Sequence, residues 1–246
     1  MNFQSLMQSL MESRKNTRLI AVDEETGGIN CHRHKDDESI PEGMTGADHF
    51  AILQFAAIVY DGYFNQIGEE LNIVIYHSEE DLEKRVGAWS KNEFKDTLMI
   101  ECPKSKISLE EAEQLIIKHL EKAGITNNQS AFMVGNSIRL DMEFLVAQMP
   151  QLEEYFHYRL IDVSTLKSIF NMLFGKFAYY KKEGKHDALS DIRESMGELK
   201  FYLDNFIVSP EEYIRNKVLG SVDANETVFI TEEKPVAKTM PILETK

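Results

Sequence analysis

Four acidic residues and one histidine could form a single site because of where they fall along the chain. Asp23 and Glu25 are two residues apart just after a short apolar run, and residues at this spacing in extended chain project to the same side. Asp141 falls in the first turn of one expected helix. Asp191 falls near the start of another, with His186 five residues before it. Ligand sites of α/β sheets gather where strands end and helices begin, so three separate segments could deliver these side chains to one edge.

This set of oxygen donors predicts a site for two Mg²⁺ or Mn²⁺ ions rather than for zinc. Two such ions about 4 Å apart form the usual clamp for in-line displacement at a phosphodiester. One activates the attacking water, and the other stabilises the leaving 3′ oxygen. His186 is then the expected general base, because an imidazole with an ordinary pKa of about 6.5 is largely neutral at working pH. Each acid alone is most simply a solvated charge in a chain with 41 of them, so the hypothesis depends on the whole set.

Hydrophobic patterning predicts the elements that would position these residues. Apolar runs predict strands over residues 19–22, 50–60, 71–76, 131–134 and 161–163. Amphipathic periodicity predicts helices over 107–123, from about 138 to 150, over 164–174 and over 188–206. The first of these begins with a capping-box pattern of Ser108 and Glu111 and is followed by Gly124. Three strands in a meander, followed by alternating helices and strands, predict a mixed α/β sheet flanked by helices.

The chain divides into three parts on the same patterning. Residues 1–17 predict an amphipathic helix that packs against the domain or a partner, with a membrane anchor as the alternative. Residues 18–206 form the main domain. Residues 207–246 form an acidic and polar tail that we expect to be partly disordered. Within the domain, the polar stretch 30–48 predicts a surface loop.

Composition excludes several classes of protein. With 246 residues and 43% hydrophobic side chains the chain can bury a full core, so wholesale disorder is excluded. Two cysteines are too few for a disulfide framework and favour the cytoplasm. No apolar run approaches the roughly 18 residues of a membrane span, and the N-terminus does not resemble a secretory signal. The net charge of −14 argues against tracking along polynucleotides. It leaves local phosphate chemistry open, because bound cations supply positive charge where the acids converge.

The motifs themselves resemble those of a known enzyme family. The segment Asp23-Glu24-Glu25, the lone Asp141 and the segment from His186 to Asp191 match the D-x-E, D and H-x-A-x-x-D motifs of the DEDDh 3′→5′ exonucleases. Residues 135–138, 144–145, 149–150, 152–153, 155–159, 162–167 and 191–195 further resemble the central block of the oligoribonucleases in that family. The resemblance covers about residues 18–206 and is faint between 62 and 130.

The resemblance implies a ribonuclease H-like fold, a homodimer and the removal of 5′-mononucleotides from very short RNAs, above all dinucleotides. Asp23, Glu25, Asp141 and Asp191 would hold the metal ions. Substrate-binding roles are implied for eight further residues. Ile29 matches an apolar wedge between the two bases, and Trp89 matches an aromatic residue that stacks on a base. The 5′ phosphate would be capped by the hydroxyl groups of Ser137, Ser164 and Thr165 and would form a charge-assisted bond with Arg159. His157 and Tyr158 match residues that reach into the partner's site.

Several features depart from the family pattern or allow another interpretation. The loop 30–48 is longer than that of the family, Gly27 stands where a threonine is usual, and the tail has no counterpart. Trp89 could instead be a core residue. Cys31, His32 and His34 suggest a metal cluster, but no second Cys/His pair lies at finger spacing, so a polar loop is the better interpretation.

Two other functions compete with hydrolysis of short RNA. One is a trimming or proofreading exonuclease on longer single-stranded DNA or RNA. The other is a non-catalytic nucleotide-binding protein, which would usually have lost a metal carboxylate, whereas all four are present here.

Overall fold

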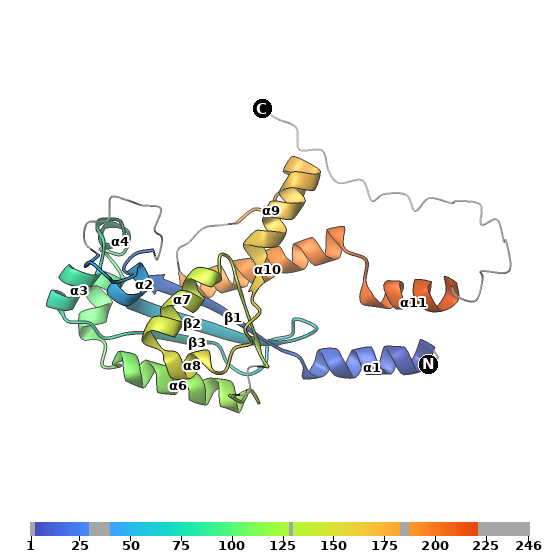
Figure 1. Ribbon diagram of the computed structural model, residues 1–246, viewed down its shortest axis with the longest axis horizontal. Helices are drawn as coiled ribbons and strands as arrows, with labels where there is room; N and C mark the ends of the chain where they lie inside the picture. The colour runs from blue at the N-terminus through green and yellow to red at the C-terminus, as the bar shows by residue number, and fades with distance from the viewer. Residues whose placement is uncertain (1–2, 30–39, 128–129, 183–186, 221–246) are drawn as a thin grey trace.

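The computed structural model describes residues 3–29, 40–127, 130–182 and 187–220. Five strands form one sheet in the order β3-β2-β1-β4-β5 (Figure 1). The strands are β1 (Arg18–Thr26), β2 (Ile52–Asp61), β3 (Leu71–Val74), β4 (Phe132–Gly135) and β5 (Ile161–Asp162). The pairs β1–β2 and β2–β3 are antiparallel, whereas β1–β4 and β4–β5 are parallel. The mixed sheet and the meander of three strands that opens it are therefore confirmed.

The two faces of β1 belong to different cores. Ile20 and Val22 lie in the larger hydrophobic cluster, and Leu19 and Ala21 lie in a second cluster. The larger cluster holds residues of α6 (Leu109–Lys122), α7 (Arg139–Gln148) and α8 (Pro150–Glu153), and the second holds residues of α9 (Val163–Phe174) and α10 (Ala188–Phe206). Because side chains alternate along a strand, Asp23 continues the α10 face and Glu24 the α7 face.

Local sequence explains how the main helices begin and end. The Ser108 side chain accepts from the backbone N–H of Glu111, and the Glu111 side chain accepts from that of Ser108, so the expected capping box is present at α6. The Asp187 carboxylate caps α10 by accepting from the N–H of Ser190. The helix then runs over residues 188–206, as its periodicity predicts. In Figure 1 α10 lies along the sheet, while α9 projects away from it.

Several short elements were not predicted from the sequence. They are α2 (Gly46–His49), α3 (Glu79–Arg85), α4 (Ala88–Glu93), α5 (Leu98–Glu101), α8, which begins at the proline where the preceding helix was expected to stop, and the 3₁₀ turns η1 (Cys102–Lys104) and η2 (Gly175–Ala178). Leu82 of α3 and Leu98 of α5 share a third hydrophobic cluster with Leu53 of β2, and Phe94, directly after α4, belongs to it too. Of the expected loop 30–48, residues 30–39 lie outside the described part of the chain, and α2 begins within the remainder.

The ends of the described chain lie side by side (Figure 1). The helix expected at the N-terminus is present as α1 (Phe3–Asn16). Helix α11 (Pro210–Gly220) occupies the start of the stretch that we expected to be an irregular tail, and Arg14 of α1 pairs with Glu211 at 3.0 Å. The expected disorder of the rest of the tail, from residue 221, lies outside the described residues, and the three-part division of the chain stays a prediction. Among the helices in the described parts of the chain, none has the length and apolar character needed to cross a bilayer.

Candidate active site

Three carboxylates from two elements converge at the site. Asp23 and Glu25 of β1 and Asp191 of α10 each offer an oxygen, and these atoms lie within 4.8 Å of one another. The sequence placed Asp23 and Glu25 just past the strand. That expectation is wrong, because both residues lie within β1, where Asp23 pairs with Ala56 of β2 and Glu25 pairs with Gln54. The strand pairing thus holds both carboxylates on the α10 face. Asp191 meets them because the Asp187 cap sets where the first turn of α10 begins.

Asp141 reaches the same strand from the other side. It lies in the first turn of α7, and its Oδ1 accepts a hydrogen bond of 3.1 Å from the backbone N–H of Glu24. Burial, with repulsion from Glu25 and Asp162, raises the pKa of Asp141 to about 7. Asp141 is not one of the three residues whose oxygens lie within 4.8 Å, although its charge acts on Glu25.

The acids crowd one another electrostatically. Burial first, and then the charges of Asp141, Glu25 and Asp191, raise the pKa of Asp23 well above its ordinary value, while Lys182 acts in the opposite direction. A divalent cation relieves this kind of repulsion and prefers hard oxygen donors. The residues present therefore fit the metal use that the motifs imply, and the cluster could bind a metal ion.

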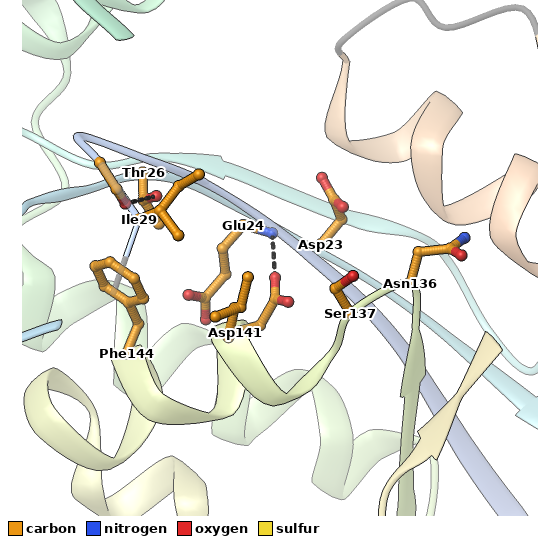
Figure 2. Close-up of a pocket in the computed structure, with 10 residues that line it drawn as sticks. Asp23, Glu24, Thr26, Ile29, Asn136, Ser137, Asp141 and Phe144 are labelled. Carbon is orange, nitrogen blue, oxygen red and sulfur yellow. Dashed lines mark hydrogen bonds between the residues drawn. The ribbon is translucent and has the colours of Figure 1, made fainter. Parts of the chain in front are cut away.

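A pocket of about 190 Å³ opens beside the acids (Figure 2). It is lined by Asp23, Glu24, Thr26, Gly28, Ile29, Asn136, Ser137, Leu140, Asp141 and Phe144. Ile29 stands at its edge with 54% of its surface exposed. Figure 2 shows Asp23 and Glu24 pointing to opposite sides of β1, with Glu24 directed towards α7. Two of the predicted metal ligands, Asp23 and Asp141, thus share one pocket with the predicted wedge Ile29 and the predicted capping residue Ser137.

The hydroxyl groups predicted to cap the 5′ phosphate follow the ends of β4 and β5. The Ser137 N–H donates both to Asp162 Oδ1 at 3.0 Å and to Ser164 Oγ at 2.9 Å. The two hydroxyl oxygens of Ser137 and Ser164 are 3.3 Å apart. Thr165 follows on the exposed first turn of α9. Strand pairing of β4 with β5 therefore brings together the serines that the sequence separates.

Other predicted binding residues lie away from this pocket within the single chain. His157 and Tyr158 stack at 4.5 Å between ring centroids, and the Arg159 guanidinium lies 5.0 Å from the centre of the Tyr158 ring. Tyr158 is 72% exposed. Trp89 on α4 is 65% exposed and meets Phe94 edge-on at 6.4 Å, so it is not the core residue that was the alternative.

Some predictions fall on residues outside the described part of the chain. His186, the expected general base, lies in the stretch 183–186 just before α10. Cys31, His32 and His34, which suggested a metal cluster, lie in the stretch 30–39.

The departure at Gly27 has a structural reason. The Gly27 N–H donates to Ala51 O at 2.7 Å, and the Gly27 carbonyl accepts from Gly87 at 2.6 Å. A Cβ at this position would overlap the carbonyl oxygen of Arg85 and lie 3.1 Å from Val86 Cα. A threonine therefore does not fit here unless this backbone shifts.

Sequence reasoning missed two groups of polar residues at the site. Glu24 lines the pocket with both carboxylate oxygens buried and without a hydrogen-bond partner among the described residues. Strand alternation could have marked it, because a glutamate there must face the α7 core. Asn136 and Glu198 hydrogen-bond to each other beneath Ser137 and Ser164. The spacing of seven residues between Asp191 and Glu198 could have placed both acids on one face of α10.

Comparison with known proteins agrees with this geometry. The family model described as Exonuclease (RNase_T) matches residues 20–199. The oligoribonuclease of Francisella tularensis subsp. tularensis (strain WY96-3418) is 41% identical over 162 residues, which cover 65% of this chain and 89% of that protein. The probable oligoribonuclease of Schizosaccharomyces pombe is 34% identical over 161 residues, covering 65% of this chain and 64% of its own.

Solved structures show the same fold. Exonuclease I of Methylocaldum szegediense matches with a TM-score of 0.55 and 15% identity over 83% of this chain and 43% of its own. E. coli exonuclease I in complex with a dA16 oligonucleotide matches with a TM-score of 0.54 and 13% identity over 84% of this chain and 46% of its own. This chain spans less than half the length of these two structures, and the likeness shows the ribonuclease H-like fold.

Fold and site together define a member of the exonuclease family. Its motifs and relatives identify the chain as one of the DEDDh oligoribonucleases of that family, and therefore as a 3′→5′ exoribonuclease. The resemblance stated from the sequence is confirmed.

Proposed function

We propose that this exoribonuclease hydrolyses very short RNAs, dinucleotides above all, to 5′-mononucleotides. The observation that carries the proposal is the pocket that Asp23, Asp141 and Ser137 line together, with Asp23 also belonging to the acid cluster with Glu25 and Asp191. The relatives named oligoribonuclease support the same substrate class.

The proposal includes two divalent ions, Mg²⁺ or Mn²⁺, held by Asp23, Glu25, Asp141 and Asp191. When bound, the ions activate water and stabilise the charge that develops on the leaving oxygen. The mutual repulsion that raises the pKa of Asp23 supports this assignment, because carboxylates crowded in this way favour a bound cation.

Three further side chains have roles in catalysis or in binding the nucleobases. His186 takes the proton from the attacking water as general base. Ile29, half exposed at the pocket edge, separates the two bases, and Trp89 offers a face on which a base stacks.

The other end of the pocket sets the substrate length. Ser137, Ser164 and Thr165 cap the 5′ phosphate with hydroxyl groups, and Arg159 adds a charge-assisted bond. A pocket that ends at the 5′ phosphate admits two nucleotides and excludes a longer strand. The convergence of Ser137 and Ser164 at 3.3 Å supports the assignment of these two hydroxyls to one phosphate.

A homodimer belongs to the same proposal. His157 and Tyr158 lie outside the pocket of their own chain, as residues that serve a partner's site would. Apolar side chains on α9 and η2 are exposed and offer a surface for that partner: Ile169, Met172, Leu173, Phe174 and Phe177. A cytoplasmic location completes the proposal, on the low cysteine content and on Cys102, which is buried and free.

A length series tests the proposal. RNA and DNA of two to ten nucleotides, 5′-labelled, would be incubated with the protein and Mg²⁺ or Mn²⁺. We expect the RNA dinucleotide to have the highest kcat/KM and the rate to fall with each added nucleotide. Comparable rates on two-mers and ten-mers would instead indicate a trimming exonuclease, and binding without turnover would indicate a nucleotide-binding protein.

A further inference from the structure

Glu198 is a fully buried acid in the middle of α10. Its exposed fraction is 0%, and it lies two turns after Asp191 on the buried face of the helix, with Met196, Leu199 and Tyr202. Its Oε1 accepts a hydrogen bond of 3.0 Å from the Tyr202 hydroxyl, and its Oε2 lies 3.0 Å from Lys182 Nζ. Lys167 Nζ lies 3.6 Å from Oε1. A buried carboxylate with this many partners is compensated, whereas removal of its charge would leave the lysines unpaired.

Asn136 connects Glu198 to the hydroxyl groups at the pocket. Its Nδ2 donates to Ser195 Oγ at 2.7 Å and to Glu198 Oε2 at 3.3 Å. Its Oδ1 accepts from Ser164 Oγ at 3.1 Å. The glutamate only accepts here, so the amide nitrogen of Asn136 must face α10 and its oxygen must face Ser164. An aspartate could not make the same pair of contacts.

This chain of contacts determines the direction of the hydrogen bonds at the serines. A hydroxyl has one proton, and that of Ser164 is donated to Asn136. The Ser164 oxygen is therefore left to accept from the Ser137 N–H, and in the 3.3 Å contact between the two hydroxyls Ser137 must be the donor. The Ser137 proton is thus the one that can turn to a ligand oxygen.

The same contacts hold Ser137 in an uncommon backbone conformation. Its φ of 54° lies in the left-handed region, which residues other than glycine rarely adopt. The Ser137 N–H is shared between Asp162 and Ser164, and the Ser164 N–H also donates to Asp162 Oδ1, at 2.8 Å. Loss of the Asn136 contact would free Ser164 to rotate and remove one of the two acceptors that hold Ser137.

We propose that Glu198 and Asn136 are positioning residues that fix the Ser164 hydroxyl, leave the Ser137 proton to be donated to the 5′ phosphate, and so set the preference for 5′-phosphorylated short RNA. The inference rests on the proposed function, in which these hydroxyls cap that phosphate. Glu198 is fully buried behind the pocket, whereas Asn136 lines it and acts here through Ser164. Glu198 orients the Asn136 amide, Asn136 fixes the Ser164 proton, and Ser137 is left as the donor to the phosphate.

The test compares two substrates on each variant: an RNA dinucleotide with a 5′ phosphate, pApA, and the same dinucleotide without it, ApA. Asn136→Ala should lower kcat/KM for pApA about tenfold, mainly through KM, the size expected for one lost hydrogen-bonding contact, and change kcat/KM for ApA much less. Glu198→Gln, which can still accept from Tyr202 or Asn136, should lower the pApA preference by a smaller factor. Lys200→Met, which removes an exposed pair with Asp204 on the same helix, should keep the wild-type preference.

The ratio of the two kcat/KM values is the decisive readout, because it does not depend on the fraction of a variant that is folded. An equal loss on pApA and ApA would show a purely structural role and overturn the inference alone. A wild-type enzyme that hydrolyses both dinucleotides without preference would also overturn it. A wild-type enzyme that hydrolyses neither would overturn the proposed function and the inference with it.

Discussion

At the scale of single residues, the proposed mechanism assigns essential roles to Asp23 and His186. Asp23→Ala removes the most crowded of the acids, and His186→Ala removes the expected base. Each should abolish measurable hydrolysis of a labelled dinucleotide while leaving the fold nearly intact, since a general base alone is worth about 10²–10⁴-fold in rate. Activity assays and thermal melting check both halves of this expectation.

Asp204→Ala is the matched control for these two variants, because Asp204 is an exposed acid on the helix that carries Asp191. It should keep the wild-type rate. If purified His186→Ala cleaved the dinucleotide at the wild-type rate, the role of this histidine as a base would be wrong.

The buried carboxyl of Glu24 is expected to lower the free energy of unfolding. Burial first, and then the charges of Asp141 and Asp23, raise its pKa well above the ordinary value, and its buried oxygens have no hydrogen-bond partner among the described residues. A buried polar group without a partner costs about 1–3 kcal/mol. Glu24→Met should therefore raise the melting temperature by several degrees, at roughly 2–4 °C per kcal/mol.

Differential scanning calorimetry of the metal-free protein measures this effect. Glu110→Met on α6 serves as the control, since Glu110 is exposed and its replacement should leave the melting temperature nearly unchanged. A lower melting temperature for Glu24→Met than for wild type would show that the buried Glu24 carboxyl stabilises the fold, contrary to this expectation.

At the scale of elements, β1, α7 and α10 bring Asp23, Asp141 and Asp191 close enough to repel one another. This repulsion predicts that the stability of the fold depends on pH. The pKa values of Asp23 and Asp141 are raised in the folded chain, that of Asp141 from 3.8 to about 7. A carboxyl with a raised pKa stabilises the fold fully below its unfolded value and loses that contribution as pH rises through its folded value. The metal-free protein should therefore become less stable between about pH 4 and 7.

Thermal melting in EDTA and in Mg²⁺ across this range provides the measurement. The melting temperature in EDTA should fall with rising pH, and the increase on adding Mg²⁺ should grow, because the ionised acids bind the cation. Asp141→Asn should flatten the EDTA curve. A wild-type curve in EDTA that is flat from pH 5 to 8 would contradict the expected crowding.

Elements also show what could be predicted from sequence and what could not. Helices α6 and α10 were predicted closely because each carries its own periodicity and capping residues. Helices α2, α4 and α5 have four to six residues, too short for a periodic signal, and α4 and α5 are held by packing against distant residues such as Leu53. The contact of Asn136 with Glu198 joins positions 62 apart in the chain, so no local sequence pattern predicts it.

At the scale of the whole molecule, the net charge of −14 is consistent with a short substrate. Affinity for long strands comes largely from many lysine and arginine contacts to phosphates. Here positive charge at the scissile phosphate would come from bound cations, and Lys167 and Lys182 are both paired with the buried Glu198. An acidic molecule with one such pocket gains little from additional nucleotides.

The proposed dimer predicts that activity depends on residues shared between two subunits. If His157 and Tyr158 act in the partner's site, Asp23→Ala and Tyr158→Ala should complement each other. In a mixed dimer, one site combines an intact Asp23 with the intact Tyr158 of the partner subunit, while the other site lacks both. Random mixing of the two inactive or weakened variants should thus restore about a quarter of the wild-type activity.

Light scattering and a dinucleotide assay before and after subunit exchange would measure this recovery. Met172→Glu, which places a charge on the exposed apolar surface of α9 where 77% of Met172 is accessible, should give a monomer and prevent the recovery. A failure of the two variants to complement despite proven exchange would show that each chain builds its site from its own residues. Recovery that persists with Met172→Glu would show that this surface of α9 is not the dimer interface.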